Sequence, residues 1–155
     1  MIIEKHKQWI MTKYSKLLKA IERSKNIELV ERSDTEFTNL VKKLVDKATR
    51  EILGINPCKV IIRKMKTRWT SCSPKGTITI NVLAKYLPTH LISYIIYHEI
   101  CHIIEAKHNK EFRTCTKKYY PNYKILEKEL MLYEIKIGLY SLFDANKTAT
   151  TYLIT

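Results

Sequence analysis

The first third of the chain has the apolar spacing of two amphipathic helices. In the first, apolar side chains recur every three or four residues at Ile3, Trp9 or Ile10, Tyr14, Leu17 and Ile21. The second begins at Ser33 and Glu36, which have the spacing of a capping box, and Gly54 is placed to end it in a left-handed conformation. The sequence therefore predicts two helices joined by residues 26–32.

The apolar period changes to two after Asn56-Pro57. Residues 59–66 are rich in β-branched side chains, and residues 77–82 alternate strictly between apolar and polar side chains. Residues 73–76 between them have the composition of a turn. This pattern predicts a β-hairpin or small antiparallel sheet, with 77–82 as a half-buried strand.

Helical spacing returns after Pro88. Thr89 is a candidate cap for a helix that ends near residue 106, Asn109 caps a short helix to about 118, and Pro121 suits the first residue of a last helix. The inner face of that last helix is predicted at Ile125, Leu126, Leu130, Tyr133 and Ile137. We therefore expect one α+β domain over residues 1–143, with a helical part (1–54) and a core (58–141), followed by a tail at 144–155.

The composition indicates which kinds of binding partner and which cellular compartment to expect. Lys and Arg number 28 against 15 for Asp and Glu, a formal net charge of +13 over 155 residues, which favours polyanionic partners. No secretory signal and no apolar stretch long enough to span a bilayer is visible, so a cytoplasmic protein, or a nuclear one if the organism has a nucleus, without a membrane partner is predicted. The chain is expected to be a monomer. The four cysteines form no C-x-x-C pair, and free thiols are expected at Cys58, Cys72, Cys101 and Cys115.

The candidate chemistry lies in His98-Glu99-Ile100-Cys101-His102, an H-E-x-x-H motif. Residues four apart lie one turn apart on the same helix face, so both imidazoles can reach one metal ion. Glu99 lies beside that ion, where a carboxylate can take a proton from water. Strongly apolar flanking residues predict a buried helix, in which two histidines and a glutamate are costly unless a metal satisfies them.

A third metal ligand must come from outside this motif, because a catalytic zinc site has three protein ligands and one open position. His108 follows His102 by six residues, and a chain that bends back after the helix can bring it to the metal. Glu105 is the rival ligand, although its place one turn further along the same helix makes closure around one ion harder. The prediction is one Zn²⁺ per chain, held by His98, His102 and His108.

Several linked motifs resemble the YgjP-like metallopeptidases, relatives of the WLM and SprT zincins. They are Arg68-Trp69-Thr70-Ser71-Cys72-Ser73, Gly76, Ile80-Asn81-Val82-Leu83, Pro88, the H-E-x-x-H motif with His108, Phe112 and Pro121-Asn122-Tyr123. The R-W-G-S-C block of the family is matched except at its glycine, which is Thr70 here. The resemblance implies a zincin-like α+β fold with an active-site helix under a small antiparallel sheet. It also implies a zinc-dependent peptidase, in a wider group whose best-known members cleave proteins attached to DNA.

Other residues are candidates for substrate or nucleic-acid contact. Arg68 and Trp69 are placed to line the cleft, although Trp69 equally suits the core, and Lys64 and Lys66 belong to a basic segment that favours DNA or RNA. Tyr119, Tyr120 and Tyr123 either donate a hydrogen bond to an oxyanion or pack on the active-site helix. The strand near Ile78 to Val82 is a candidate for pairing its edge with an extended peptide.

The function predicted from these residues is hydrolysis of peptide bonds by a zinc-activated water with Glu99 as general base, on substrates that include nucleic-acid-associated proteins. Two alternatives stay open at this point. One is a nucleic-acid-binding module with a structural zinc, which the lack of thiolates at matching spacing disfavours. The other is a metal-dependent hydrolase of non-peptide substrates.

Overall fold

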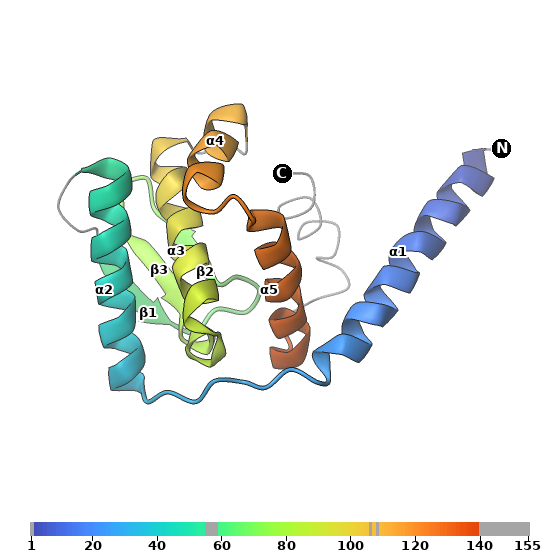
Figure 1. Cartoon of the computed structure of the whole chain (residues 1–155), viewed down its shortest axis with the longest axis horizontal. Helices are drawn as coiled ribbons and strands as arrows, with labels where there is room; N and C mark the ends of the chain where they lie inside the picture. The colour runs from blue at the N-terminus through green and yellow to red at the C-terminus, as the bar shows by residue number, and fades with distance from the viewer. Residues whose placement is uncertain (1, 55–58, 106, 108, 140–155) are drawn as a thin grey trace.

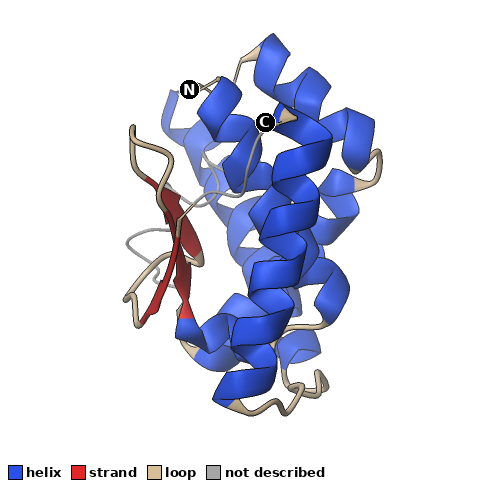
Figure 2. Cartoon of the chain, turned by 90° about the vertical axis from the view of Figure 1, so that its left-hand side faces the viewer, coloured by secondary structure: helices blue, strands red, loops and turns tan. Residues whose placement is uncertain are grey.

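The structure, a computed structural model, describes residues 2–54, 59–105, 107 and 109–139. In these residues a small sheet forms one layer, and helices pack on one side of it (Figures 1 and 2). The elements in chain order are α1 (Ile2–Ser24), α2 (Asp34–Leu53), β1 (Val60–Arg63), β2 (Thr70–Cys72), β3 (Ile78–Asn81), the short 3₁₀ helix η1 (Val82–Tyr86), α3 (Thr89–Ile104), α4 (Lys110–Tyr119) and α5 (Tyr123–Ile137). The predicted α+β class is confirmed. None of the helices in the described ranges combines the length and apolarity needed to cross a bilayer.

The sheet is mixed rather than antiparallel. Its strand order is β1-β3-β2, with β1 parallel to β3 and β2 antiparallel to β3. The predicted turn at 73–76 is present, closed by a hydrogen bond from Ser73 N to Thr77 O (2.9 Å), with Gly76 at a φ of 85°. It joins β3 to the three-residue strand β2 instead of to residues 59–66. That extra reversal of the chain brings β3 back beside β1 in the same direction.

The position of β3 in the middle of the sheet corrects two predictions. All four of its residues are buried, so it is not a half-buried strand. Both of its edges are already paired, so it cannot pair with an extended peptide, and β2 and β1 are the edge strands of the described sheet. Among the described residues only glycines have a positive φ, so Thr70 takes an ordinary strand conformation in β2.

The helix boundaries follow the local signals in most places. Ser33 and Glu36 form the capping box at the start of α2, with Ser33 Oγ accepting from Glu36 N at 3.1 Å. Gly54 ends that helix at a φ of 64°. Asn109 caps α4, because its Oδ1 accepts a hydrogen bond from Phe112 N at 3.1 Å.

Two predicted starts of helices are wrong by one or two residues. The residue that caps α3 is Pro88, while the Thr89 hydroxyl accepts a hydrogen bond from the Arg32 guanidinium at 3.0 Å instead of capping the helix. The last helix, α5, begins at Tyr123 rather than at Pro121. Its side chain Ile125 is 66 % exposed, so this residue is not on the inner face as predicted.

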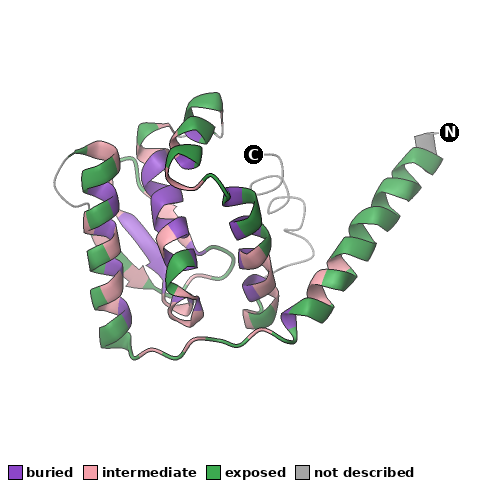
Figure 3. Cartoon of the chain, viewed as in Figure 1, coloured by how far each residue is buried: buried purple, intermediate pink, exposed green. Residues whose placement is uncertain are grey.

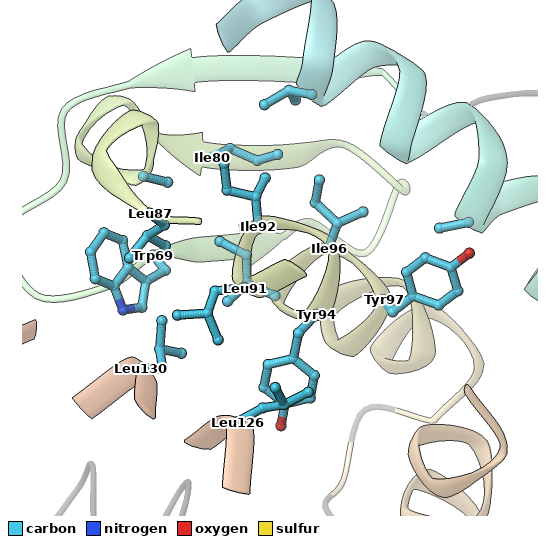
Figure 4. Close-up of a cluster of buried hydrophobic side chains, with 14 of the residues drawn as sticks. Trp69, Ile80, Leu87, Leu91, Ile92, Tyr94, Ile96, Tyr97, Leu126 and Leu130 are labelled. Atoms are coloured by element: carbon cyan, nitrogen blue, oxygen red, sulfur yellow. The ribbon is translucent and has the colours of Figure 1, made fainter. Parts of the chain in front are cut away.

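The core is built around α3, which is buried on most of its surface (Figure 4). Side chains from three sides meet there, and the labelled ones are Trp69, Ile80, Leu87, Leu91, Ile92, Tyr94, Ile96, Tyr97, Leu126 and Leu130. Burying one Leu or Ile side chain stabilises a fold by about 1.5–3 kcal/mol. The apolar positions of α3 therefore offset the cost of burying His98 and Glu99 in the same helix.

Helix α1 lies largely outside this core. It packs on α5 through its last turns, where Leu17 and Ile21 are partly buried and Ser24 is buried. Residues 4–16 of this helix are exposed (Figure 3), including the apolar side chains Trp9 (53 %) and Ile10 (57 %). The predicted helix is present, but only part of its apolar face is covered. The predicted tail, 144–155, lies outside the described residues.

Candidate active site

The residues of the H-E-x-x-H motif lie together near the C-terminal end of α3. His98 and His102 are one turn apart, with ring centroids 5.0 Å apart and planes at 76°. His98 is 8 % exposed and Glu99 is 9 % exposed. The apolar run around the motif explains this burial, because a helix that is hydrophobic on most of its surface must be covered.

The end of α3 orients the second imidazole. The helix stops at Ile104, and Glu105 takes an extended conformation that turns its carbonyl oxygen toward His102, 3.2 Å from Nδ1. When Nδ1 carries the proton, it donates to that carbonyl, and Nε2 is then the nitrogen that presents a lone pair to a metal. This backbone contact is the usual way in which a metal-binding histidine is held in one tautomer.

Phe112 of α4 packs against both imidazoles. It is stacked on His102, with centroids 4.3 Å apart and planes at 21°, and it meets His98 edge-on at 4.9 Å. Its exposed fraction is 2 %. Phe112 therefore forms an apolar wall beside the two rings. The sequence marked this residue only as one of the positions matched to the family pattern, since a lone Phe in a polar helix carries no signal of its contacts.

A disulfide joins Cys101 of α3 to Cys115 of α4, with the Cα atoms 6.1 Å apart. The prediction of free thiols is wrong for these two residues, and Cys101 is not a simple apolar filler. The thiol of Cys72 donates a hydrogen bond to the Ser73 carbonyl at 3.4 Å, and Cys58 lies outside the described residues. The sequence did not predict this disulfide, because the two cysteines lie on different helices. They meet only through the way the chain bends between α3 and α4. The bridge fixes α4, and with it Phe112, against the motif.

Glu99 has a hydrogen-bond partner on β2. Thr70 Oγ1 donates to Glu99 Oε2 at 2.7 Å. Burial raises the pKa of Glu99, and the Thr70 hydrogen bond and the positive charge of Arg68 oppose that rise. Glu99 is thus a buried carboxyl group whose ionised form is stabilised by two interactions from one short segment of chain.

The candidates for substrate contact divide into buried and exposed residues. Trp69 is 2 % exposed and donates from its indole Nε1 to Glu134 Oε1 at 2.9 Å. Of the two positions that the sequence allowed, the cleft and the core, Trp69 therefore occupies the core. Lys64, Lys66 and Arg68 are exposed on the loop between β1 and β2. This loop leads directly into Thr70, so the charges lie close in sequence to the partner of Glu99.

The tyrosines at the end of α4 and the start of α5 make structural contacts. Tyr119 donates from its hydroxyl to Glu51 O at 2.9 Å, and the hydroxyl of Tyr120 shares a hydrogen bond with Ser93 Oγ at 2.6 Å. Tyr123 is buried, with 5 % exposed. These contacts favour packing on α3 over a hydrogen bond to an oxyanion.

The nature of the side chains at this site fits a zinc ion. Two imidazoles on one helix face, with a carboxylate one position along from the first, supply nitrogen ligands that zinc accepts and a base beside them. No group of three His, Cys, Asp or Glu side chains suited to a metal occurs within the described part of the chain. The predicted third ligand, His108, lies outside that part. Its rival Glu105 accepts a hydrogen bond from Lys107 N at 3.3 Å through its carboxylate.

A helix that carries H-E-x-x-H against a small sheet, in an α+β domain, defines the class of zincin-like metallopeptidases. The chain belongs to the YgjP-like metallopeptidase domain family, whose model matches residues 29–133. It is therefore a hydrolase of the metallopeptidase class.

Two solved structures are similar to the chain. The chain is similar to the metallopeptidase zymogen abylysin of Pyrococcus abyssi, with 32 % identity and a TM-score of 0.54, over 59 % of this chain and 91 % of that one. It also shares its fold with the metallopeptidase zymogen jannalysin of Methanocaldococcus jannaschii, with 24 % identity and a TM-score of 0.52, over 59 % of this chain and 92 % of that one. No curated protein sequence is significantly similar to the chain.

Proposed function

We propose that the protein is a zinc-dependent peptidase in which His98, His102 and His108 hold one Zn²⁺ per chain. When bound by these residues, zinc would polarise a scissile carbonyl and would lower the pKa of a water molecule. Glu99 would accept the proton of the attacking water and pass it to the leaving amine nitrogen. The observation that carries the proposal is the grouping of both imidazoles and a buried, hydrogen-bonded carboxylate on one helix of a metallopeptidase domain.

The described sheet offers β2 as the strand that pairs with an extended peptide. Trp69 O accepts from Asn81 N at 2.7 Å, and Ser73 N donates to Thr77 O, so the odd-numbered residues of this segment bond to β3. Because hydrogen-bonded and non-hydrogen-bonded pairs alternate in an antiparallel ladder, the backbone groups of Thr70 and Cys72 point to the opposite edge. A peptide added at that edge lies next to the residue that contacts Glu99.

We further propose that proteins associated with nucleic acid are among the substrates. Two features support this: the formal net charge of +13, and the exposed cations Lys64, Lys66 and Arg68 on the loop that leads into β2. A cationic loop beside the site raises the local concentration of polyanions and of proteins bound to them.

The test combines metal analysis with hydrolysis of a mixed protein panel, with and without DNA. We expect about one zinc per chain, lost in His98→Ala or His102→Ala and retained in His90→Ala. His90 is a matched control because it lies on the same helix and is bonded to Glu129 at the surface (2.9 Å). Glu99→Gln keeps the size of the side chain but cannot accept the proton, so it should retain zinc and lose on the order of 10²–10⁴ in rate.

Three results would contradict the proposal. Wild-type protein that folds but takes up no zinc would remove the metal site. Zinc-loaded protein that cleaves no member of the panel would remove peptides as the substrate. Equal rates for wild type and Glu99→Gln would remove Glu99 as the base.

A further inference from the structure

The segment that precedes and begins β2 is held in place from the side of β3. Asn81 Nδ2 donates to Arg68 O at 2.8 Å and to Met65 O at 2.9 Å, while Asn81 N donates to Trp69 O at 2.7 Å. Asn81 itself has no exposed surface. One buried asparagine thus fixes three carbonyl groups of the chain leading into Thr70.

The same segment is held from the side of α5. The indole of Trp69 is buried and donates to Glu134 at 2.9 Å. Trp69, the residue before Thr70, is therefore bound to β3 through its carbonyl and to α5 through its side chain, and the Arg68 carbonyl is bound to Asn81 of β3. The contacts of the residues before Thr70 therefore fix its backbone position independently of its own side chain.

The side chain of Thr70 is suited to restrict the orientation of the Glu99 carboxylate. A β-branched residue in a strand has a restricted χ1, so its hydroxyl keeps one direction relative to the backbone. That hydroxyl donates to Oε2 of Glu99 at 2.7 Å. Because this bond takes up one lone pair of Oε2, we expect Oε1 to be the oxygen that accepts a proton from water.

We propose that Thr70 is a positioning residue, which holds the Glu99 carboxylate in the orientation required for proton transfer. This inference rests on the proposed function and adds a residue to it. The block at 68–72 resembles the R-W-G-S-C pattern except at this position, and a glycine there has no hydroxyl with which to make the bond. A carboxylate held in one orientation loses less rotamer freedom on reaching the transition state, which is the advantage of a preorganised site.

The experiment compares Thr70→Val, Thr70→Ser and Thr77→Val in the full-length, zinc-loaded protein. Valine keeps the shape of threonine without the hydroxyl, and serine keeps the hydroxyl without the methyl group. Thr77→Val makes the same chemical change on the same hairpin, at a residue whose hydrogen bonds to Ser73 run through its backbone. We expect Thr70→Val to lower kcat by about 10- to 100-fold with KM within about twofold of wild type, because a hydrogen bond to a charged group is lost. Thr70→Ser and Thr77→Val should stay within about threefold of wild type.

A binding measurement separates this inference from the proposed function. Acetohydroxamic acid binds zinc and shares its acidic proton with a neighbouring carboxylate, so calorimetric titration of this probe reports the orientation of Glu99 without turnover. Thr70→Val should weaken its binding on the order of tenfold, while leaving zinc content unchanged. If wild type binds the probe but cleaves no peptide, the proposed function fails and the role of Thr70 is still tested.

Two outcomes would overturn the role of Thr70. In one, Thr70→Val matches Thr77→Val in kcat and in binding of the probe. In the other, Thr70→Ser falls as far as Thr70→Val, which would show that the methyl group matters for packing and the hydroxyl does not. If Thr70→Val folds poorly, Thr70→Ala replaces it, and the comparison with Thr70→Ser is made at equal zinc content.

Discussion

The indole Nε1 of Trp69 donates a hydrogen bond to Glu134 Oε1 at 2.9 Å, across 65 positions of sequence. This bond ties the start of β2 to α5 in the interior, where Glu134 is 6 % exposed. Burial raises the pKa of Glu134 to about 7, and the bond from Trp69 only partly opposes the rise. The folded protein therefore keeps this carboxyl group protonated over a range of pH in which the unfolded chain ionises it.

The raised pKa of Glu134 predicts a pH-dependent stability. Between about pH 4.5 and pH 7 the folded state binds the proton and the unfolded state does not, so the contribution of Glu134 is fully present below 4.5 and is lost as the pH rises to about 7. The full difference is on the order of 3 kcal/mol. Glu134→Gln keeps an acceptor for Trp69 and cannot ionise. We expect its stability relative to wild type to rise with pH across this range in urea unfolding.

Glu127→Gln is a second, parallel test of this prediction. Glu127 also lies on α5 and accepts a hydrogen bond from the Tyr94 hydroxyl at 3.1 Å, and burial raises its pKa to about 7. The double variant should therefore have a flatter stability profile than either single variant. A difference between wild type and Glu134→Gln that stays constant from pH 4.5 to pH 8 would mean that the pKa of Glu134 is not raised.

The identity of the third zinc ligand is a separate prediction. His108→Ala should weaken zinc binding more than Glu105→Ala, because the Glu105 carboxylate accepts from Lys107 N in the bend after α3. Loss of one protein ligand of three leaves an incomplete site, whereas loss of a carboxylate that orders a loop affects the metal indirectly. Competition of each variant with a zinc chelator measures the two affinities. The reverse order would identify Glu105 as the ligand.

The disulfide predicts a stability that depends on redox conditions. Cys101 and Cys115 are separated by 14 positions, and closing a loop of that length stabilises a fold by about 3 kcal/mol in the chain-entropy model. Cys115→Ala should lower the free energy of unfolding by about 2–3 kcal/mol in oxidising buffer. In the presence of a dithiol reductant, the difference in the free energy of unfolding between wild type and Cys115→Ala should shrink. What remains should be only the packing energy lost with one side chain.

Cys72→Ala is the matched control for the disulfide. Cys72 lies on β2 and hydrogen-bonds to Ser73 O through its thiol, so its replacement should change stability equally with and without reductant. A count of titratable thiols on the denatured protein gives a second measurement. A wild-type protein whose unfolding does not respond to reductant would contradict a bridge between Cys101 and Cys115.

Local chemistry made much of the fold predictable from sequence. The capping box at Ser33 and Glu36, the Asn109 cap and the turn at 73–76 all depend on residues within a few positions of one another. Such signals are carried by short stretches of chain and need no tertiary partner. The burial of the motif helix was also predictable, because its flanking residues are almost all apolar.

Contacts between distant segments could not be predicted in this way. The strand β2 has three residues, Thr70-Ser71-Cys72, with no alternation of apolar and polar side chains, and it exists because β3 is there to pair with it. Its presence changed the order of the sheet and placed Thr70 against Glu99, a contact across 29 positions. The Cys101–Cys115 bridge and the packing of Phe112 on His102 likewise follow from how α4 returns along α3.

The last prediction concerns the exposed cations on the loop before β2. If nucleic acid brings substrates to the site, the protein should bind DNA or RNA without sequence preference and with an affinity that falls steeply with salt, because counterion release drives such binding. Replacing Lys64 and Lys66 with Glu should weaken this binding and reduce the slope of log affinity against log salt by roughly 2, with zinc content unchanged.

The control is the double variant Lys13→Glu with Lys16→Glu. It makes the same change of net charge on the exposed half of α1 and should weaken binding less. Equal effects of the two double variants in a mobility-shift titration would mean that total charge, not this loop, attracts the polyanion. If wild type produces no mobility shift at low ionic strength, nucleic acid has no part in selecting the substrate. The proposed peptidase chemistry on α3 would be unaffected by that result.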